Sequence, residues 1–433
     1  MNKILNKVIQ RFRNNKEVKN ASWLICGKLA QMILSFFVSI LTARYLGPSN
    51  YGTISYVNAY IAFFTSLCTL GINAVIIKDF VEKPQEQGAA IGTTLIMRFA
   101  SSFFSAVMTF CIVSVVDHNE PTTIVVAALC SVALVFQVFD TFNYWFQSRY
   151  ESKITSIATF VAYTATALYR LVLLALHKDV RWFAFATSVD YIVLGVLLFF
   201  SYKKHDGPKL SISLEKGKSL LGRSYHYILS GMMVAIYGQT DKFMLKQMLD
   251  ETSVGYYSIA ASVNLMWVFV LQAIIDSLYP TIMQLFEEDR EQFNRKNRQL
   301  YAIVIYVSMA AAICFILFAP LVIKILYGDA YMPAVGPLRV ITWYTIFSYL
   351  GVARNAWIVC MNKQKYLKYM YLSAAFINIG LNYIMIPMWG ASGAALASLL
   401  TEVCTSLVLP CCWKDMRPNV RLMIDAFLLR GVK

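Results

Sequence analysis

Long apolar runs fill most of the chain, and short polar segments separate them. Twelve of these runs approach or exceed the roughly 20 residues that an α-helix needs to cross about 30 Å of hydrocarbon. They cover residues 21–45, 53–77, 88–116, 121–147, 153–177, 182–202, 224–249, 252–286, 299–326, 331–359, 366–387 and 391–412. Ten-residue blocks of alternating apolar and polar residues, which are typical of a membrane β-barrel, do not occur in the sequence. The pattern predicts an all-α integral membrane protein with twelve transmembrane helices.

A single long polar segment interrupts this series after the sixth run, at residues 203–223. It predicts a cytoplasmic linker between two bundles of six helices, which would occupy residues 21–202 and 224–412. The remaining ends are an N-terminal segment at 1–20 and a tail at 413–433.

A short internal repeat supports this division. The segment that follows the first apolar run matches the segment at the end of the seventh at three positions in register. Leu46, Gly52 and Ser55 match Leu249, Gly255 and Ser258. Six crossings return the chain to the side from which it started. We therefore expect a parallel repeat, whose two halves are related by an axis along the membrane normal.

The distribution of Lys and Arg predicts the orientation. If the N-terminus is cytoplasmic, 28 of these residues fall in inner segments, five in outer loops and helix ends, and six within the apolar runs. Cytoplasmic loops carry such an excess, so both termini are expected to be cytoplasmic. The N-terminal segment repeats apolar residues at helical spacing between basic ones, which favours an amphipathic helix on the inner surface over a frayed tail.

The composition excludes several classes of protein. Hydrophobic residues make up 58% of the chain and charged residues only 15%, so a soluble enzyme and a disordered protein are excluded. The net charge of +15 is explained by membrane topology and does not indicate nucleic acid. Nine cysteines without any Cys-x-x-Cys pair predict neither a disulfide framework nor a metal site.

Four motifs, spread from the first run to the last, carry a family resemblance. They are Ala-Arg-Tyr-Leu-Gly-Pro-Ser-Asn-Tyr-Gly at 43–52, Gln-Thr-Asp-Lys-Phe-Met-Leu at 239–245, Leu-Tyr-Gly-Asp-Ala-Tyr at 326–331 with Leu-Arg at 338–339, and Gly-Ala-Ser-Gly-Ala-Ala-Leu-Ala at 390–397. In this order the chain resembles the bacterial polysaccharide (O-antigen unit) flippases of the multidrug/oligosaccharidyl-lipid/polysaccharide exporter superfamily. The resemblance implies a MATE/MOP-like fold, with two six-helix bundles around a central cavity. It also implies transport of an oligosaccharide repeat unit linked to undecaprenyl diphosphate across the bacterial cytoplasmic (inner) membrane.

Charged residues within the apolar runs are the candidate site residues. An ionised side chain at mid-bilayer costs about 3 kcal/mol or more, so each is expected to face protein or trapped water. For the diphosphate and sugar we single out Lys28, Arg98, Arg170, Asp241, Lys242 and Arg339. Arginine can clamp phosphate oxygens in bidentate fashion, whereas lysine acts as a point charge. The resemblance implies that the first and seventh runs line the cavity, which favours Lys28 and Lys242.

Ordinary structural roles remain open for these residues. Lys28 lies near enough to the inner end of its run to extend to the interface, and Arg170 stands close to the outer end of its own. Arg339 could order the outer loop, and Arg354, near an inner end, could meet lipid headgroups.

The acidic residues are candidates for binding a coupling proton or sodium ion. They are Glu402, Asp140, Asp190 and Asp276, of which Glu402 lies deepest in its run. The alternative is a structural pairing with a basic residue on another helix.

The sequence contains no Walker A, dinucleotide-binding glycine, His-Glu-x-x-His or Gly-x-Ser-x-Gly motif. We therefore expect no enzyme activity, no catalytic residues, no metal and no cofactor. The expected partners are the lipid-linked glycan, membrane lipid and the polysaccharide polymerase and ligase. Two other functions stay open: an ion-coupled drug or cation antiporter of the same superfamily, and a flippase for the peptidoglycan precursor.

Overall fold

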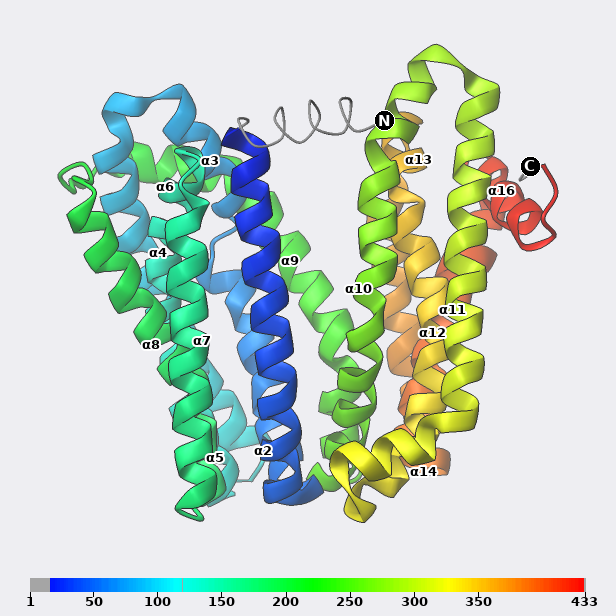
Figure 1. Cartoon of the computed structure of the whole chain (residues 1–433), viewed down its shortest axis with the longest axis horizontal. Helices are drawn as coiled ribbons and strands as arrows, with labels where there is room; N and C mark the ends of the chain where they lie inside the picture. The colour runs from blue at the N-terminus through cyan, green and yellow to red at the C-terminus, as the bar shows by residue number, and fades with distance from the viewer. Residues whose placement is uncertain (1–15, 119, 432–433) are drawn as a thin grey trace, which may run out of the picture. The chain divides into compact units, whose positions relative to one another are not determined.

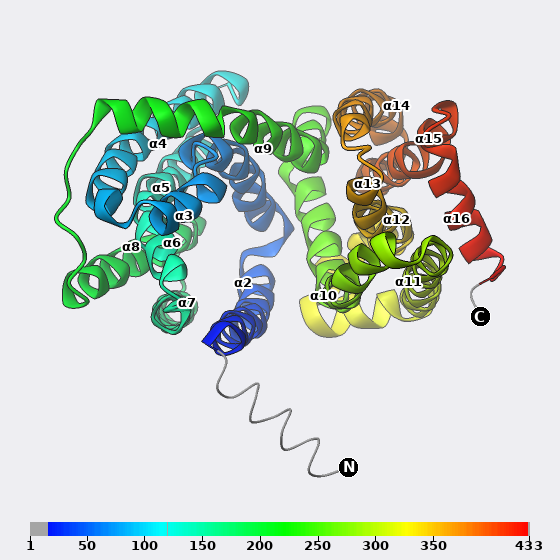
Figure 2. The same ribbon diagram turned by 90° about the horizontal axis from the view of Figure 1, so that it is seen from above.

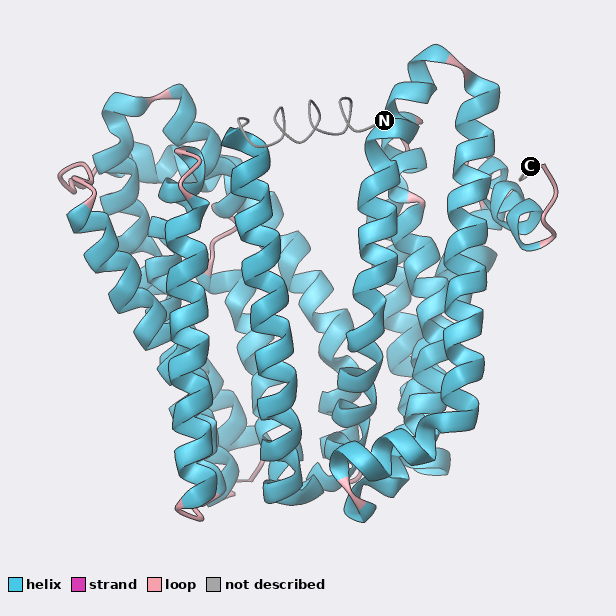
Figure 3. Cartoon of the chain, viewed as in Figure 1, coloured by secondary structure: helices cyan, strands magenta, loops and turns pink. Residues whose placement is uncertain are grey.

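The computed structural model describes residues 16–118 and 120–431. Most side chains between residues 16 and 30 lie outside this description, among them the candidate Lys28. Of the predicted N-terminal amphipathic segment, residues 1–15 also lie outside the described residues. In the described ranges the chain is helical and contains no strand (Figures 1 and 3).

The first half of the chain forms α2 to α9. The α-helices are α2 (Lys16–Cys68), α3 (Asn73–Glu82), α4 (Gln87–Val116), α5 (Pro121–Phe136), α6 (Asp140–Ser148), α7 (Ser152–Ala175), α8 (Val180–Lys204) and α9 (Leu214–Met248). Short 3-10 turns, η1 (Pro84–Glu86) and η2 (Gln137–Phe139), precede α4 and α6. Within this half, α5 packs against α4 and α8, and α8 packs against α7 (Figure 2).

The second half forms α10 to α16. Its α-helices are α10 (Glu251–Glu288), α11 (Arg290–Tyr327), α12 (Val335–Ala353), α13 (Asn355–Cys360), α14 (Lys365–Val403), α15 (Leu409–Cys412) and α16 (Arg417–Phe427). The turn η3 (Asp329–Ala334) precedes α12, and a π-helical turn η4 (Cys404–Val408) continues α14. Helix α12 is central, because it packs against α10, α11 and α14.

The predicted fold class is confirmed. Eight helices in the described ranges are long and apolar enough to cross a membrane, and together they contain ten of the twelve predicted spans. The other two predicted spans correspond to α9 and to α12 with α13. Two pairs of spans run on within one helical segment each, α2 and α14, and the breaks fall at Gly47 (φ 72°) and Gly390 (φ 55°). Both angles lie in the left-handed region that glycine tolerates best.

The predicted end of the second span, at residue 77, is wrong. The span ends at Cys68, and a turn through Leu70 and Gly71, both with positive φ, leads into the separate helix α3. Apolar residues of α3 such as Ile76 and Phe80 are buried in the core of this half, which explains why hydropathy alone extended the span.

The chain divides into two compact units that do not follow the order of the chain strictly. Unit 1 comprises Met1–Leu46 and Val57–Ala235, and unit 2 comprises Gly47–Tyr56 and Ile236–Lys433. The polar segment 203–223 and the first part of α9 therefore belong to unit 1, and the turn after the first predicted span belongs to unit 2.

Close backbone contact holds the polar segment 203–223 on α4. A Cβ at Gly88 would overlap the carbonyl oxygen of Lys209, and one at Gly92 would overlap that of Ser211. The Ser211 backbone N–H donates to the carbonyl oxygen of Gly88 at 3.2 Å. The segment is thus packed along α4 rather than looping freely.

An ion-pair cluster fixes the start of α9 to α3. Lys216 Nζ lies 2.7 Å from Asp79 Oδ2 and also contacts Glu86, and Arg223 Nη2 donates to Asp79 Oδ1 at 2.8 Å. Burial alone raises the pKa of the Asp79 carboxyl, but the hydrogen bonds from Lys216 and Arg223 outweigh burial and hold that pKa below its usual range. The Asp79 carboxylate therefore stabilises unit 1 in its ionised form.

The two copies of the internal repeat meet inside unit 2. A Cβ at Gly52 would overlap the carbonyl oxygen of Glu251, and one at Gly255 would overlap the carbonyl oxygen of Pro48. Gln247 Nε2 also donates to the Tyr56 hydroxyl at 3.0 Å. This contact explains why residues 47–56 join unit 2, and why glycine occupies both repeat positions.

Candidate functional site

Unit 1 contains a row of four charged side chains between its helices, with two acids flanked by two arginines. Arg98 of α4 lies within electrostatic range of Asp140 of α6, Asp140 within range of Asp190 of α8, and Asp190 within range of Arg170 of α7. The structure thus brings together four residues that the sequence analysis had divided between substrate binding and ion coupling. Each acid has an arginine on its outer side, which compensates part of the cost of placing four ionisable groups among membrane helices.

Arg98 is held by neutral oxygen atoms. Its side chain is 1% exposed, and it donates to the carbonyl oxygen of Cys68 at 3.4 Å, to that of Gln137 at 3.0 Å and to the Thr141 hydroxyl at 3.1 Å. Cys68 is the last residue of α2, and Gln137 opens the turn η2, so Arg98 satisfies carbonyl groups where two helices end. The geometry gives Arg98 a role in joining α2, α4 and α6.

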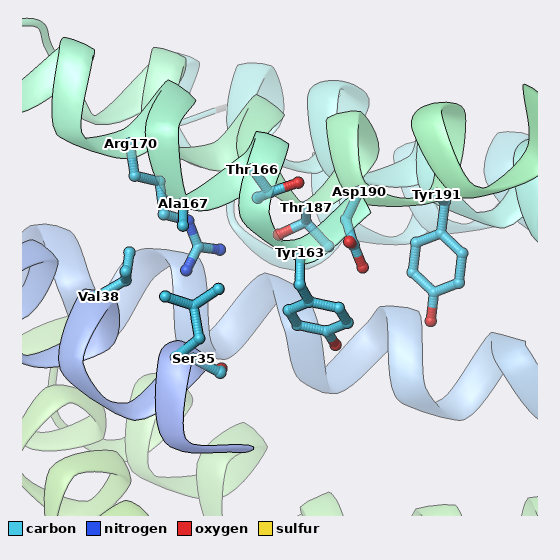
Figure 4. A pocket seen from close by; sticks show the side chains of 10 residues that line it. Ser35, Val38, Tyr163, Thr166, Ala167, Arg170, Thr187, Asp190 and Tyr191 are labelled. Carbon is cyan, nitrogen blue, oxygen red and sulfur yellow. The ribbon is translucent and has the colours of Figure 1, made fainter. Parts of the chain in front are cut away.

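Arg170 and Asp190 instead line a cavity of about 230 Å³ in unit 1. Figure 4 shows both side chains there with Tyr163 and Thr166 from α7 and Thr187 and Tyr191 from α8; α2 closes the other side with Ser35 and Val38. One Asp190 oxygen, Oδ1, is buried without a hydrogen-bond partner among the described residues. The cavity therefore offers a guanidinium, a carboxylate, hydroxyl groups and two aromatic rings within a small volume.

Unit 2 contains a buried carboxylate that neutral donors surround. Asp241 of α9 is buried, and its oxygens accept hydrogen bonds from Asn382 at 2.7 Å, Ser398 at 2.6 Å and Asn378 at 3.2 Å, and from the Tyr257 hydroxyl. These donors come from α10 and α14, so one carboxylate joins three helices. Asp241 was predicted to contact substrate, and the structure places it in this buried polar cluster.

A second acid of unit 2, Glu402, lies at the end of α14, directly before the π-helical turn η4. Glu402 accepts a hydrogen bond from the Tyr237 hydroxyl at 2.8 Å and one from Ser406 at 3.5 Å, and it lies within electrostatic range of Arg354. Arg354 is 6% exposed and donates to the carbonyl oxygens of Thr405 and Ser406 at 3.3 and 3.4 Å. Arg354 is thus part of the protein interior and does not extend to headgroups, which is the role left open for it.

Of the other predicted residues, Lys242 borders the Asp241 cluster, and Arg339 and Asp276 are exposed outside both clusters. Lys242, the neighbour of Asp241 in sequence, is partly buried within electrostatic range of that carboxylate. Arg339 is exposed and donates through Nε to the carbonyl oxygen of Ile316 on α11 at 3.1 Å, which fits the alternative of a local structural role. Asp276 is exposed and accepts a hydrogen bond from Gln272 at 2.8 Å.

Sequence reasoning missed the neutral partners of the charges. In unit 2 these are Tyr257, Asn378, Asn382 and Ser398. The spacing of Asn378 and Asn382, four residues apart in an apolar run, places both amides on one helical face, and this signal could have found them. In unit 1, Tyr163 and Tyr191 gave no comparable signal, because tyrosines are frequent throughout this chain.

The comparison with protein families decides to which family the chain belongs. The profile of a family described as "Polysaccharide biosynthesis protein" matches residues 40–336. The chain belongs to this polysaccharide biosynthesis family. It is also similar to two proteins named "Putative O-antigen transporter". The one from Escherichia coli (strain K12) is 19% identical over 90% of this chain and 95% of the relative, and the one from Shigella flexneri is 21% identical over 90% and 96%.

Solved structures show the same fold. The inward-facing conformation of a multidrug resistance MATE family transporter of the MOP superfamily matches with a TM-score of 0.72 at 13% identity, over 90% of this chain and 95% of that one. The lipid II flippase MurJ, in an inward closed conformation, matches with a TM-score of 0.72 at 13% identity, over 94% and 92%. The chain therefore has the fold of the MOP superfamily.

Proposed function

We propose that this protein is a flippase that moves an oligosaccharide repeat unit linked to undecaprenyl diphosphate from the cytoplasmic to the outer face of a bacterial inner membrane. The repeat unit would serve O-antigen, capsule or exopolysaccharide synthesis, and the transport would proceed by alternating access. The observation that carries this proposal is the cavity of unit 1, where Arg170 and Asp190 stand among hydroxyl groups and aromatic rings. The family, and the names of the relatives, are consistent with it.

The chemistry of the cavity suits the headgroup of such a lipid. Passage of a diphosphate through hydrocarbon is prohibitive unless its charge is compensated, and the Arg170 guanidinium can donate two parallel hydrogen bonds to phosphate oxygens. Carboxylate and hydroxyl side chains such as Asp190 and Thr187 suit sugar hydroxyls, and the rings of Tyr163 and Tyr191 can cover the apolar face of a sugar.

The size of the cavity limits what it holds. Its volume of about 230 Å³ is smaller than the roughly 300–1,000 Å³ of sites for drug-sized ligands. It is suited to one phosphate or one sugar ring rather than a whole repeat unit. We propose that it recognises the part of the headgroup nearest the lipid, which repeat units of different sugars share.

Asp190 is the strongest candidate for ion coupling in unit 1. It faces Arg170 in the cavity, so uptake of a proton or a sodium ion by its carboxylate would remove one negative charge beside the guanidinium and strengthen anion binding there. Glu402 and Asp140 remain further candidates, since both lie beside an arginine.

Orientation and partners are proposals of the same kind. The excess of Lys and Arg in alternate segments predicts that both termini are cytoplasmic. A flippase of this kind would deliver its cargo on the outer face to a polysaccharide polymerase and ligase.

The test is complementation of a strain that lacks the gene. Arg170→Ala should abolish surface glycan and cause lipid-linked sugar to accumulate on the cytoplasmic face, at an unchanged level of membrane protein. Arg181→Ala is the matched control, because Arg181 is an exposed arginine of α8 that pairs with Asp179 outside the cavity. Normal glycan export by Arg170→Ala would contradict the proposed site. A strain without the gene that accumulates no lipid-linked sugar but becomes sensitive to cationic drugs would point to the antiporter instead.

A further inference from the structure

Helix α16 is fixed on unit 2 by one of its faces. Leu422, Met423 and Ala426 are buried in the hydrophobic core of this unit, where α16 packs against α11, and Val420 is buried on the same helix. Asn419 Nδ2 donates to the Tyr301 hydroxyl at 2.7 Å. The predicted tail at 413–433 therefore contains a docked helix with a fixed orientation.

The segment before α16 is also anchored. Asp415 accepts a hydrogen bond from the Tyr366 hydroxyl at 2.8 Å and pairs with Lys363 at 3.0 Å, and the Trp413 ring packs against Tyr366. Both the segment before α16 and one face of α16 are therefore held on unit 2. This fixes which side chains form the opposite, exposed face of the helix.

This other face combines arginine with large apolar residues. Arg417, Arg421, Ile424 and Leu428 follow one another at steps of four, three and four residues, so they form one stripe along the helix. Ile424 is 50% exposed, Leu428 47% and the adjacent Phe427 53%. Leu429 and Arg430 extend the stripe past the end of the helix, and both are exposed.

The positive charge of this face is not neutralised by the protein. Among the described residues, Arg421 and Arg430 make no ion pair, and the single acid between residues 417 and 431 is the partly buried Asp425. Arg421 and Arg430 differ in this respect from Lys216 and Arg223 of unit 1, which both form ion pairs with Asp79.

The length of α11 places α16 at the membrane surface. Its 38 residues make a helix of about 57 Å, whereas the hydrocarbon is about 30 Å thick. The yellow end of α11 turns aside (Figure 1), and Pro320 lies within this helix, so about 20 spanning residues are counted back from there and α11 enters the hydrocarbon close to Leu300. The Tyr306 hydroxyl, six residues or about 9 Å farther along α11, donates to the carbonyl oxygen of Phe427 at 2.8 Å. The end of α16 therefore lies at the boundary of the interface and the acyl chains, on the side where α11 begins.

The exposed face of α16 continues the exposed side of α11. Ile303, Tyr306 and Val307 are exposed on α11 beside this contact. A surface that joins a membrane-spanning helix and carries arginine between isoleucine, leucine and phenylalanine is suited to the boundary of headgroups and acyl chains.

We propose that the exposed face of α16, formed by Arg417, Arg421, Ile424, Phe427, Leu428 and Arg430, is a binding site for anionic phospholipid of the inner leaflet. The apolar side chains enter the acyl region, and the arginines reach the phosphate groups. The charge selects the occupant: an arginine-rich face suits negatively charged headgroups, whereas a second copy of the chain would bring the same arginines into repulsion. The inference does not depend on the proposed transport function.

The experiment uses purified full-length protein in detergent, titrated with phosphatidylglycerol or phosphatidylcholine and examined by native mass spectrometry. The wild-type protein should retain phosphatidylglycerol in preference to phosphatidylcholine. An arginine near an anionic surface contributes about 1 kcal/mol, or about fivefold in affinity. The double variant Arg421→Gln with Arg430→Gln should therefore lose about 25-fold in affinity for phosphatidylglycerol and little for phosphatidylcholine.

A matched control removes two positive charges from the part of α11 that lies before the membrane. Arg295→Gln with Lys296→Gln should leave phosphatidylglycerol binding within about twofold of wild type. Equal retention of both lipids by wild type, or equal losses in the two double variants, would overturn the proposal. So would a wild-type dimer that the Arg421 and Arg430 variant converts to monomer, or selective retention of undecaprenyl diphosphate over phosphatidylglycerol, because each identifies a different occupant.

Discussion

The two units satisfy buried charged side chains among their membrane helices in opposite ways. The row in unit 1 contains Arg98, Arg170, Asp140 and Asp190, and the clusters of unit 2 contain Lys242, Arg354, Asp241 and Glu402. In unit 1 a cation, Arg98, is surrounded by neutral acceptors; in unit 2 an anion, Asp241, is surrounded by neutral donors.

This difference separates structural charges from available ones. Arg98 and Asp241 each join three helices, and their hydrogen bonds leave little capacity for a ligand. Arg170 and Asp190 line a cavity, where there is room for a ligand beside them. Depth in the membrane therefore does not separate the two kinds of charge; what separates them is whether the side chain lines a cavity.

The largest loss of stability is expected where residues 47–56, from the first half of the chain, pack against α10 in unit 2. Gly255→Ala places a Cβ on the carbonyl oxygen of Pro48, which is backbone and cannot rotate away. We expect a loss of about 3 kcal/mol or more, or failure to fold, because backbone overlap exceeds ordinary overpacking. Thermal unfolding in detergent measures it.

Gly380→Ala in α14 is the control, since nothing lies within 4 Å of a Cβ there. It should leave stability unchanged or raise it by up to about 1 kcal/mol. Equal stability of the two variants would contradict the contact between the repeat motifs.

Removal of the satisfied anion should come next in size. Asp241→Ala leaves the donors of Tyr257, Asn378, Asn382 and Ser398 without their acceptor, and each unpaired buried group costs about 1–3 kcal/mol. We expect a total loss of about 3 kcal/mol or more in thermal unfolding. Asp276→Ala, which removes an exposed acid of the same unit, should change stability by less than about 0.5 kcal/mol. Similar losses for both would show that the cluster does not stabilise unit 2.

Asp190→Asn in unit 1 should give the opposite profile. Its oxygen Oδ1 has no hydrogen-bond partner among the described residues, so the substitution should cost less than about 1 kcal/mol in stability. Transport should fall by about tenfold or more, since an amide cannot take up and release the proposed coupling ion. The export rate divided by the level of folded protein measures the loss of transport. A variant that is strongly destabilised but exports glycan at the normal rate per folded molecule would show that Asp190 has a structural role instead.

The smallest effect concerns pH and the cluster at Asp79. A lowered pKa means that the ionised carboxylate stabilises unit 1 above the ordinary pKa of aspartate, and that this stabilisation is lost as the pH falls through the lowered value. Wild type should therefore lose part of its advantage over Asp79→Asn as the pH falls from about 5 to about 2. Melting temperatures of both proteins across this range provide the test. A constant difference would show that the charge of Asp79 does not contribute.

Hydropathy predicted the fold closely because lipid imposes one simple rule on spanning helices: their outer surface is apolar and their backbone is satisfied internally. It failed at Cys68, because the apolar residues at the start of α3 continue the run but are buried against protein. It could not show that residues 47–56 belong to unit 2 either, because that assignment depends on backbone contact between Gly52 and Glu251.

The candidate site was predicted only as a set of charges. Arg170 and Asp190 were both singled out, but their meeting across α7 and α8 depends on the rotation of two helices, which periodicity does not determine. The donors around Asp241 are neutral, and neutral polar residues are common in membrane helices, so their meeting required the structure. Arg339 and Asp276 show the converse: charge within an apolar run, yet exposed in the structure.

The most direct test of the account is translocation by the purified protein. Wild type, Arg170→Ala and Arg181→Ala are reconstituted in vesicles with undecaprenyl diphosphate that carries a labelled oligosaccharide, and an enzyme added outside measures how much label becomes accessible. The account predicts translocation by wild type and by Arg181→Ala, and none above protein-free vesicles by Arg170→Ala. Equal translocation by all three proteins, or none by wild type, would contradict it.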